Sequence, residues 1–174
     1  MVIKTLLITC LFFIFYQDLR YRAVYWIVFP FLLLLMIIEG TKNQTIFQLA
    51  TNTGINLAFF LVQLILISAY FSIRHRCMIN ITTNYLGLGD ILFLICISAY
   101  LSPLNYILFY VISLFAALCV ALMQFLIQRK AAYKIPLAGL QAFFLAFTFL
   151  AEWNFKFFSL SDDSWLHSYL MPFI

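Results

Sequence analysis

Long apolar runs, separated by short polar or basic segments, make up most of the chain. These runs predict six transmembrane helices, within residues 1–16, 24–38, 46–73, 88–101, 106–127 and 135–151. Because a span needs about 20 apolar residues, the first helix is expected to continue towards Asp18. The third run is longer than a span needs, so its first turns are expected to lie outside the hydrocarbon core. The pattern predicts an all-α polytopic membrane protein with one membrane-embedded domain over residues 1–174.

The polar segments between these runs predict the turns, at residues 17–22, 39–45, 74–86, 102–105 and 128–134. Pro30 is expected to kink the second helix, because a proline inside a helix removes a backbone hydrogen bond. Pro136 is expected in the first turn of the last helix, where a missing N–H is tolerated. A tail follows from Glu152. Its last stretch, from Trp165 onward, is too short to span and is expected on the membrane surface.

The composition excludes a soluble protein of this size. Hydrophobic residues make up 66% of the chain and charged residues 9%, whereas soluble domains are nearer half apolar and a quarter charged. No basic run is long enough to indicate nucleic-acid binding. The four cysteines form no C-x-x-C pair and have no metal-type spacing, so they are interpreted as structural. No metal is expected.

The distribution of lysine and arginine predicts the orientation. With six spans, the first, third and fifth loops lie on one side, and they carry Arg20, Arg22, Arg74, Arg76, Arg129, Lys130 and Lys134. The other side carries Lys4, Lys42 and Lys156. The positive-inside rule therefore places the basic loops in the cytoplasm and both termini outside. The expected location is the inner (plasma) membrane, with lipid as the surroundings.

Two acids lie at the ends of apolar runs. Asp18 ends the first predicted span and Asp90 begins the fourth, so both are expected at the cytoplasmic face and at similar shallow depth. An acid at the centre of a membrane helix costs roughly 2.5–3.5 kcal/mol on insertion scales, which makes such residues functional candidates. Gly87 and Gly89 precede Asp90. They are expected to let the backbone leave helical geometry and let another chain approach closely.

Two carboxylates in one site can catalyse peptide hydrolysis without a cofactor. When they lie close together, one keeps its proton near neutral pH while the other is ionised. The ionised acid takes a proton from water, and the protonated acid assists the carbonyl oxygen and the leaving amine. The chain contains neither an H-E-x-x-H zinc motif nor a G-x-S-x-G elbow. The two histidines, His75 and His167, lie on opposite sides of the predicted membrane.

Each acid also has a purely structural interpretation. Asp18 could pair with Arg20 or Arg22 at a helix end, as a surface salt bridge that provides roughly 0–1 kcal/mol. Asp90 could be a carboxylate stabilised by the dipole at a helix N-terminus. Either interpretation alone would leave the chain without catalytic chemistry.

The motifs around both acids resemble those of the type IV prepilin peptidases. Gly87-Leu88-Gly89-Asp90 matches the G-x-G-D motif of intramembrane aspartic proteases, and Asp18-Leu19-Arg20-Tyr21-Arg22 is similar to the D-x-x-x-R segment that follows the first span in that family. Ile135-Pro136-Leu137-Ala138 resembles the start of the family's last span. The resemblance implies an aspartic endopeptidase with Asp18 and Asp90 as catalytic acids and the two glycines as supporting residues.

The chain departs from the family pattern at three places. Leu92 stands where the family often has lysine, and Ala23-Val24 follows the arginine where Ile-Pro is frequent. The cytoplasmic methyltransferase region with paired cysteines is absent. The resemblance therefore implies a short form that carries only peptidase activity. It also implies a pilin-like precursor as substrate, with a short basic leader that is cut at the cytoplasmic side, typically after glycine.

Two other functions remain open from the sequence. The chain could be a non-catalytic membrane subunit of a secretion or assembly system, which the departures at Leu92 and Ala23-Val24 would favour. It could also be a small transporter whose acids carry protons, although inverted repeats, which would favour transport, are not seen in the sequence. The identity of the precursor and the oligomeric state are left open.

Overall fold

The structure, a computed structural model, describes residues 2–76, 87–128, 137–154 and 159–165, and the regular structure within them is helical. The helices are α1 (Val2–Tyr21), α2 (Val28–Asn43), α3 (Ile46–His75), α5 (Leu88–Ser98), α6 (Pro103–Gln128) and α7 (Leu137–Asn154). The predicted all-α fold is confirmed. By length and composition, α1, α3 and the part of α6 up to Met123 can each cross a membrane, and α5 is a shorter apolar helix. The number of spans stays a prediction.

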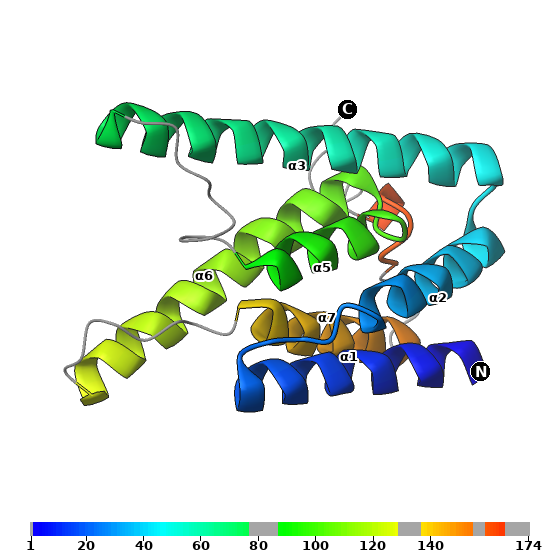
Figure 1. Ribbon diagram of the computed structural model, residues 1–174. Coiled ribbons are helices and arrows are strands. Elements are labelled where there is room, and N and C mark those ends of the chain that lie inside the picture. Colours follow the sequence, from blue (N-terminus) through cyan, green and yellow to red (C-terminus); the bar gives the residue numbers. More distant parts are fainter. Residues whose placement is uncertain (1, 77–86, 129–136, 155–158, 166–174) are drawn as a thin grey trace.

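Successive helices run in alternating directions, with α2 and α6 inclined to α1 and α3 (Figure 1). α1 packs most extensively against α7, α2 packs against α1 and α5, and α3 lies across α5 and α6. As a result α1 ends where α5 and α7 begin, at the left of Figure 1, which we call the Asp18 end. The opposite end, where α2 ends and α3 begins, we call the Glu39 end.

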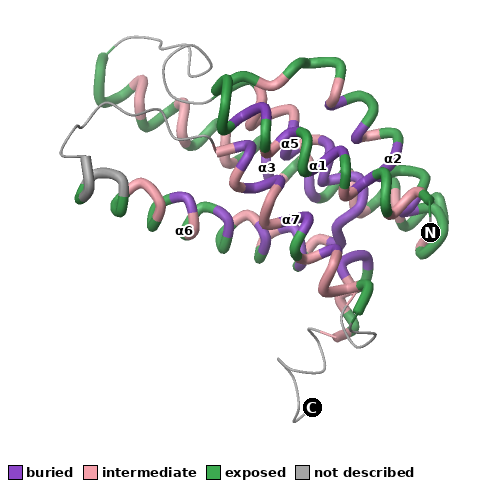
Figure 2. The backbone as a smooth tube through the Cα atoms, turned by 90° about the horizontal axis from the view of Figure 1, so that it is seen from below, coloured by how far each residue is buried: buried purple, intermediate pink, exposed green. Residues whose placement is uncertain are grey.

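The core lies where α2, α5 and α7 pack together with α1. Figure 2 shows buried positions concentrated around α1, α2 and α5, while α6 has buried positions mainly along the side that faces the bundle. Buried Asn56 of α3 donates to the carbonyl oxygens of Ser98 at 3.0 Å and Leu101 at 2.7 Å. These bonds satisfy carbonyl groups at the end of α5, which would be costly to leave unpaired in apolar surroundings.

Outward-facing positions of the long helices are apolar. α3 buries Asn56 and Phe60, while side chains such as Ile65, Leu66 and Ile73 are exposed. Apolar surface of this extent is unfavourable in water and favourable in a hydrocarbon environment. The surface of α3 therefore agrees with the membrane-protein class.

Two expectations about α2 were wrong. α2 begins only at Val28, so Pro30 lies in its first turn, where its missing N–H breaks no helical hydrogen bond and produces no kink. Residues 39–43 belong to the helix rather than to a turn. The helix continues because Glu39 is buried and pairs with Lys42 three residues later, at 2.6 Å.

The turn before α6 and the tail also differ from expectation. Pro103 begins α6 instead of lying within a turn, a position that suits proline because its fixed φ is already helical. Residues 152–154 extend α7, and residues 159–165 fold back against the start of α6. The loop at 77–86, the start of the last predicted span at 135–136 and the tail after Trp165 lie outside the described residues.

Candidate active site

Asp18 lies in the last turn of α1, on the face that also buries Leu11 and Ile14. Its Oδ2 accepts a hydrogen bond from the backbone N–H of Gly139 in the first turn of α7, at 2.6 Å. A Cβ atom at Gly139 would lie 2.9 Å from the Asp18 Cβ and 3.0 Å from its Oδ2. The close approach of α1 and α7 at this point therefore requires glycine at position 139.

Asp90 is the third residue of α5 and lies near Asp18 and the start of α7. Its Oδ2 accepts from the backbone N–H of Gly87 at 3.2 Å, which closes the first turn of the helix. The Asp90 carboxyl group is close enough to Asp18 for the two to interact electrostatically, and the backbone amide of Ala138 also acts on it. The structure thus brings together the two acids that the sequence singled out.

The N-terminus of α7 provides the setting for both acids. The first N–H groups of a helix have no partner within the helix, and the helix dipole adds partial positive charge there. Such a site favours anions. Ala138 and Gly139 present their amides to Asp90 and Asp18 respectively. Among the described residues, a negative charge on the carboxylate pair is therefore supported by backbone N–H groups.

The sequence did not single out Ala138 and Gly139 as site residues. The expected first-turn position of Pro136 was a signal that free N–H groups would lie just after it. Which acid those groups would meet depends on the packing of α7 against α1, and no local pattern specifies that packing.

The two glycines of the G-x-G-D motif have ordinary backbone angles, so what matters is the room that a side chain would need at each position. Gly87 precedes α5 in extended backbone, with φ −67° and ψ 141°, which any residue can adopt. A Cβ there would lie 3.0 Å from Asp90 Oδ2. Gly89 lies inside the helix, and its nearest neighbour, Phe29 Cζ, would be 3.7 Å from an added Cβ. Gly87 is thus the more restricted of the two.

The salt-bridge interpretation of Asp18 finds no support in the described residues. Arg20 donates to the hydroxyl of Tyr16 and lies over the rings of Tyr16 and Tyr21. The salt bridges within the described ranges are both made by Glu39.

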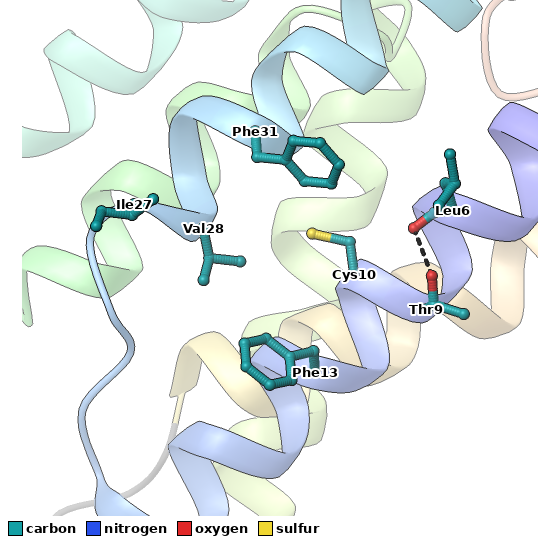
Figure 3. A pocket seen from close by; sticks show the side chains of 7 residues that line it. All are labelled: Leu6, Thr9, Cys10, Phe13, Ile27, Val28 and Phe31. Carbon is teal, nitrogen blue, oxygen red and sulfur yellow. Dashed lines mark hydrogen bonds between the residues drawn. The ribbon is translucent and has the colours of Figure 1, made fainter.

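An apolar groove lies elsewhere, between α1 and the start of α2. It has a volume of about 440 Å³ and is lined by Leu6, Thr9, Cys10, Phe13, Ile27, Val28 and Phe31 (Figure 3). The hydroxyl of Thr9 donates to the carbonyl oxygen of Leu6 at 2.9 Å, so it is already paired. Neither acid lines this groove. Its chemistry suits a hydrocarbon chain and not peptide hydrolysis.

Comparison with known proteins identifies the class. A sequence model of the type IV leader peptidase family matches residues 5–122. This is more than half of the chain, so the chain belongs to the type IV leader peptidase family, and the resemblance drawn from its motifs is confirmed. The fold and the family together define a leader peptidase-like membrane protease. No curated protein and no solved structure matches the chain.

The matched region has a clear relation to the site. It contains both Asp18 and Asp90 and ends within α6, before α7 begins. The contribution of Ala138 and Gly139 therefore comes from the structure and not from the family match.

Proposed function

We propose that this protein is an aspartic endopeptidase that removes the leader of pilin-like precursors at the cytoplasmic face of the membrane. The observation that supports this most is the meeting of Asp18 and Asp90 at the N-terminus of α7. These acids come from two helices far apart in the sequence, and the salt bridges among the described residues involve neither of them.

In the proposed reaction the two acids activate one water molecule. The ionised carboxylate takes a proton from water while the water oxygen attacks the carbonyl carbon of the scissile peptide bond. The protonated acid donates a hydrogen bond to the carbonyl oxygen as negative charge develops on it. Collapse of the tetrahedral intermediate breaks the C–N bond, and the leaving nitrogen takes a proton from an acid. The products are a leader with a free carboxylate and a mature chain with a free amine.

Leu92 is the departure from the family pattern that bears on this proposal. Its side chain is partly buried and packs against the hydrophobic core. A lysine there would have to place its charge beside apolar side chains, so leucine suits this packing. The alternative function as a non-catalytic assembly subunit depends on this departure and predicts no cleavage.

The direct test is a cleavage assay with the full-length protein in liposomes. A precursor with a basic leader, a glycine and an apolar helix is added, and mass spectrometry identifies any new N-terminus. We expect a single cut directly after the glycine. A precursor that stays intact would favour the assembly subunit or the transporter.

The proposed orientation can be tested separately. Arg76 follows α3 at the Asp18 end, and Lys42 lies in the last turn of α2 at the Glu39 end. Single cysteines at these positions, in a background without the native cysteines, are treated in whole cells with an impermeant thiol reagent. We expect labelling at position 42 and not at position 76. The reverse pattern would place the acids at the outer face.

A further inference from the structure

A polar side chain lies in the apolar interior of the bundle, one helical turn after Ala138. Gln141 of α7 is 0% exposed, and its Nε2 donates to Ser113 Oγ of α6 at 3.2 Å. Its Oε1 has no hydrogen-bond partner among the described residues. Turning the amide over exchanges the two atoms. One end of the group therefore lacks a partner in either orientation.

The neighbouring hydroxyl does not satisfy this oxygen. Ser113 Oγ already donates to the carbonyl oxygen of Tyr110 at 3.0 Å. Burial of an amide oxygen without a donor is unfavourable, and such groups are rare in folded proteins. A leucine or methionine would fill the same space without this cost. The unpaired oxygen of Gln141 therefore has room in its hydrogen bonding for a donor that is not among the described residues.

Gln141 lies one turn after Ala138, the residue whose backbone amide acts on Asp90. Ala138 is three residues earlier, and residues at this spacing share one face of a helix. At a rise of 1.5 Å per residue, Gln141 lies about 4.5 Å farther from the Asp18 end than Ala138 does. A chain cut at the acids and continuing into the bundle would pass this position.

The part of α6 beyond Ser113 has apolar side chains on its surface. Beyond Ser113, α6 runs on to Gln128 and leads away from the start of α7 (Figure 1). Apolar side chains on this part of α6, including Leu122, Met123 and Leu126, are exposed. Gln141 contacts α6 at Ser113, next to this apolar part of the helix.

We propose that Gln141 Oε1 accepts a hydrogen bond from a main-chain N–H of the precursor on the C-terminal side of the scissile bond. This proposal rests on the proposed peptidase function. A peptide must be extended to reach the acids, so its N–H groups there have lost their helical partners and need acceptors in apolar surroundings. An extended chain rises about 3.3 Å per residue, which places the bonded N–H within about two residues of the cut. The bond to Ser113 holds the amide in position.

The test is a backbone-ester scan. Synthetic precursors carry an ester in place of one amide at each of the first three positions after the cut, which removes one N–H at a time. For the unmodified protein we expect one of these esters to lower kcat/KM by about threefold to tenfold, the effect of one hydrogen bond. For Gln141→Leu we expect a similar loss with the all-amide precursor and no further loss with that ester. Most of the loss should lie in KM.

Three variants separate recognition from structure. Ser113→Ala removes the bond between α6 and α7 but keeps the acceptor, so it should keep the ester sensitivity. Gln63→Leu makes the same change on α3, away from the acids, and should behave like the unmodified protein. Gln141→Met replaces the leucine variant if that variant fails to fold. Ester sensitivity that persists in the Gln141 variants would overturn the proposal. An unmodified protein that cuts no precursor would instead refute the proposed function.

Discussion

The two ends of the bundle both hold buried carboxylates, but these carboxylates have different partners. At the Glu39 end, Glu39 is 2% exposed and pairs with Lys42 at 2.6 Å and Lys4 at 3.8 Å. Glu152 accepts from the Tyr100 hydroxyl at 3.2 Å and from the backbone N–H of Leu160 at 3.0 Å. Each of these acids therefore has a cation or a set of hydrogen-bond donors as its partner.

The tail strengthens the same end. Asp163 accepts from the backbone N–H groups of Leu104 and Asn105, both at 3.4 Å, and from the Ser102 hydroxyl. It thus caps the start of α6 from a segment about sixty residues later in the chain. Asn105 in turn donates to carbonyl oxygens of the tail, including that of Ser159 at 3.0 Å. The acids at this end join α1, α2, α6, α7 and the tail.

At the Asp18 end the described partners of the carboxylates are backbone N–H groups and the other acid. Asp18 and Asp90 have one another and backbone N–H groups from residues 87, 138 and 139 as neighbours. The comparison teaches that burial alone does not mark a functional acid in this protein. The distinguishing feature is the partner, since cations and caps stabilise the fold, whereas a second acid beside a helix N-terminus leaves protons to be exchanged.

The largest expected effect comes from the acid pair itself. Asp18→Asn or Asp90→Asn should lower precursor processing by roughly 10²–10⁴-fold, because neither acid can exchange a proton after the change. The double variant should be little worse, since groups that act as a unit are not additive. Processing is measured in cells that make each variant at matched levels.

The matched control for these variants is Asp163→Asn at the other end, which should process precursor normally once folded. Both variants of the pair should still insert, because an amide is less costly to bury than a carboxylate. Normal processing by Asp18→Asn would show that this chain is not a two-aspartate protease.

The second prediction concerns Gly139, which holds α7 against Asp18. In Gly139→Ala the new Cβ would lie 2.9 Å from Asp18 Cβ, so α1 and α7 must move apart. A displacement approaching 1 Å costs about 10²-fold in rate. Gly54→Ala is the control, since nothing lies within 4 Å of its added Cβ. Equal processing by the two variants would mean that the contact between α7 and Asp18 has no role in catalysis.

The sequence predicted much of this site, and the reasons are physical. Charge on alternate loops and the length of the apolar runs placed Asp18 and Asp90 at the same end, because helices that cross a layer must alternate in direction. The G-x-G-D motif then marked Asp90 and its glycines. These features depend on local composition and on the alternation of loops between the two sides of the membrane. Both can be read from a single sequence.

The remaining features depend on tertiary packing. The prediction of a turn at residues 39–45 failed for residues 39–43, because the buried pair of Glu39 with Lys42 extends α2. The role of Gly139 depends on the distance between two helices, and the cap provided by Asp163 depends on where the tail folds. No pattern of apolar and polar positions specifies these contacts.

The third prediction moves to the Glu39 end, where stability rather than rate should change. Glu39→Gln keeps the shape but removes the charge between Lys4 and Lys42, and should lower the free energy of unfolding by about 1.5–3 kcal/mol, the range for hydrogen bonds to charged groups. Thermal unfolding in detergent measures it. Processing per folded molecule should stay within about twofold of the unmodified protein, less than the effect of one hydrogen bond at the site. If Glu39→Gln lost most of its processing but kept its full stability, the acids at the Glu39 end could not be described as purely stabilising.

The smallest expected effects separate the two glycines of the motif. In Gly87→Ala the added Cβ would lie 3.0 Å from Asp90 Oδ2, so the carboxylate must shift by a few tenths of an ångström. This shift should lower processing by roughly threefold to tenfold, less than for a full 1 Å displacement. In Gly89→Ala the nearest atom, Phe29 Cζ, is at 3.7 Å, an ordinary contact.

Gly89→Ala should therefore process within about twofold of the unmodified protein and unfold at a similar temperature, because position 89 lies in the first turn of α5 and the added Cβ makes an ordinary contact. Gly89→Leu extends beyond the free space towards Phe29 and should lower processing strongly, with little loss of inserted protein. Cleavage assays and thermal unfolding of the three variants at matched levels decide the order. If Gly89→Ala is the most damaging, the motif acts through the backbone of α5 and not through the space beside Asp90.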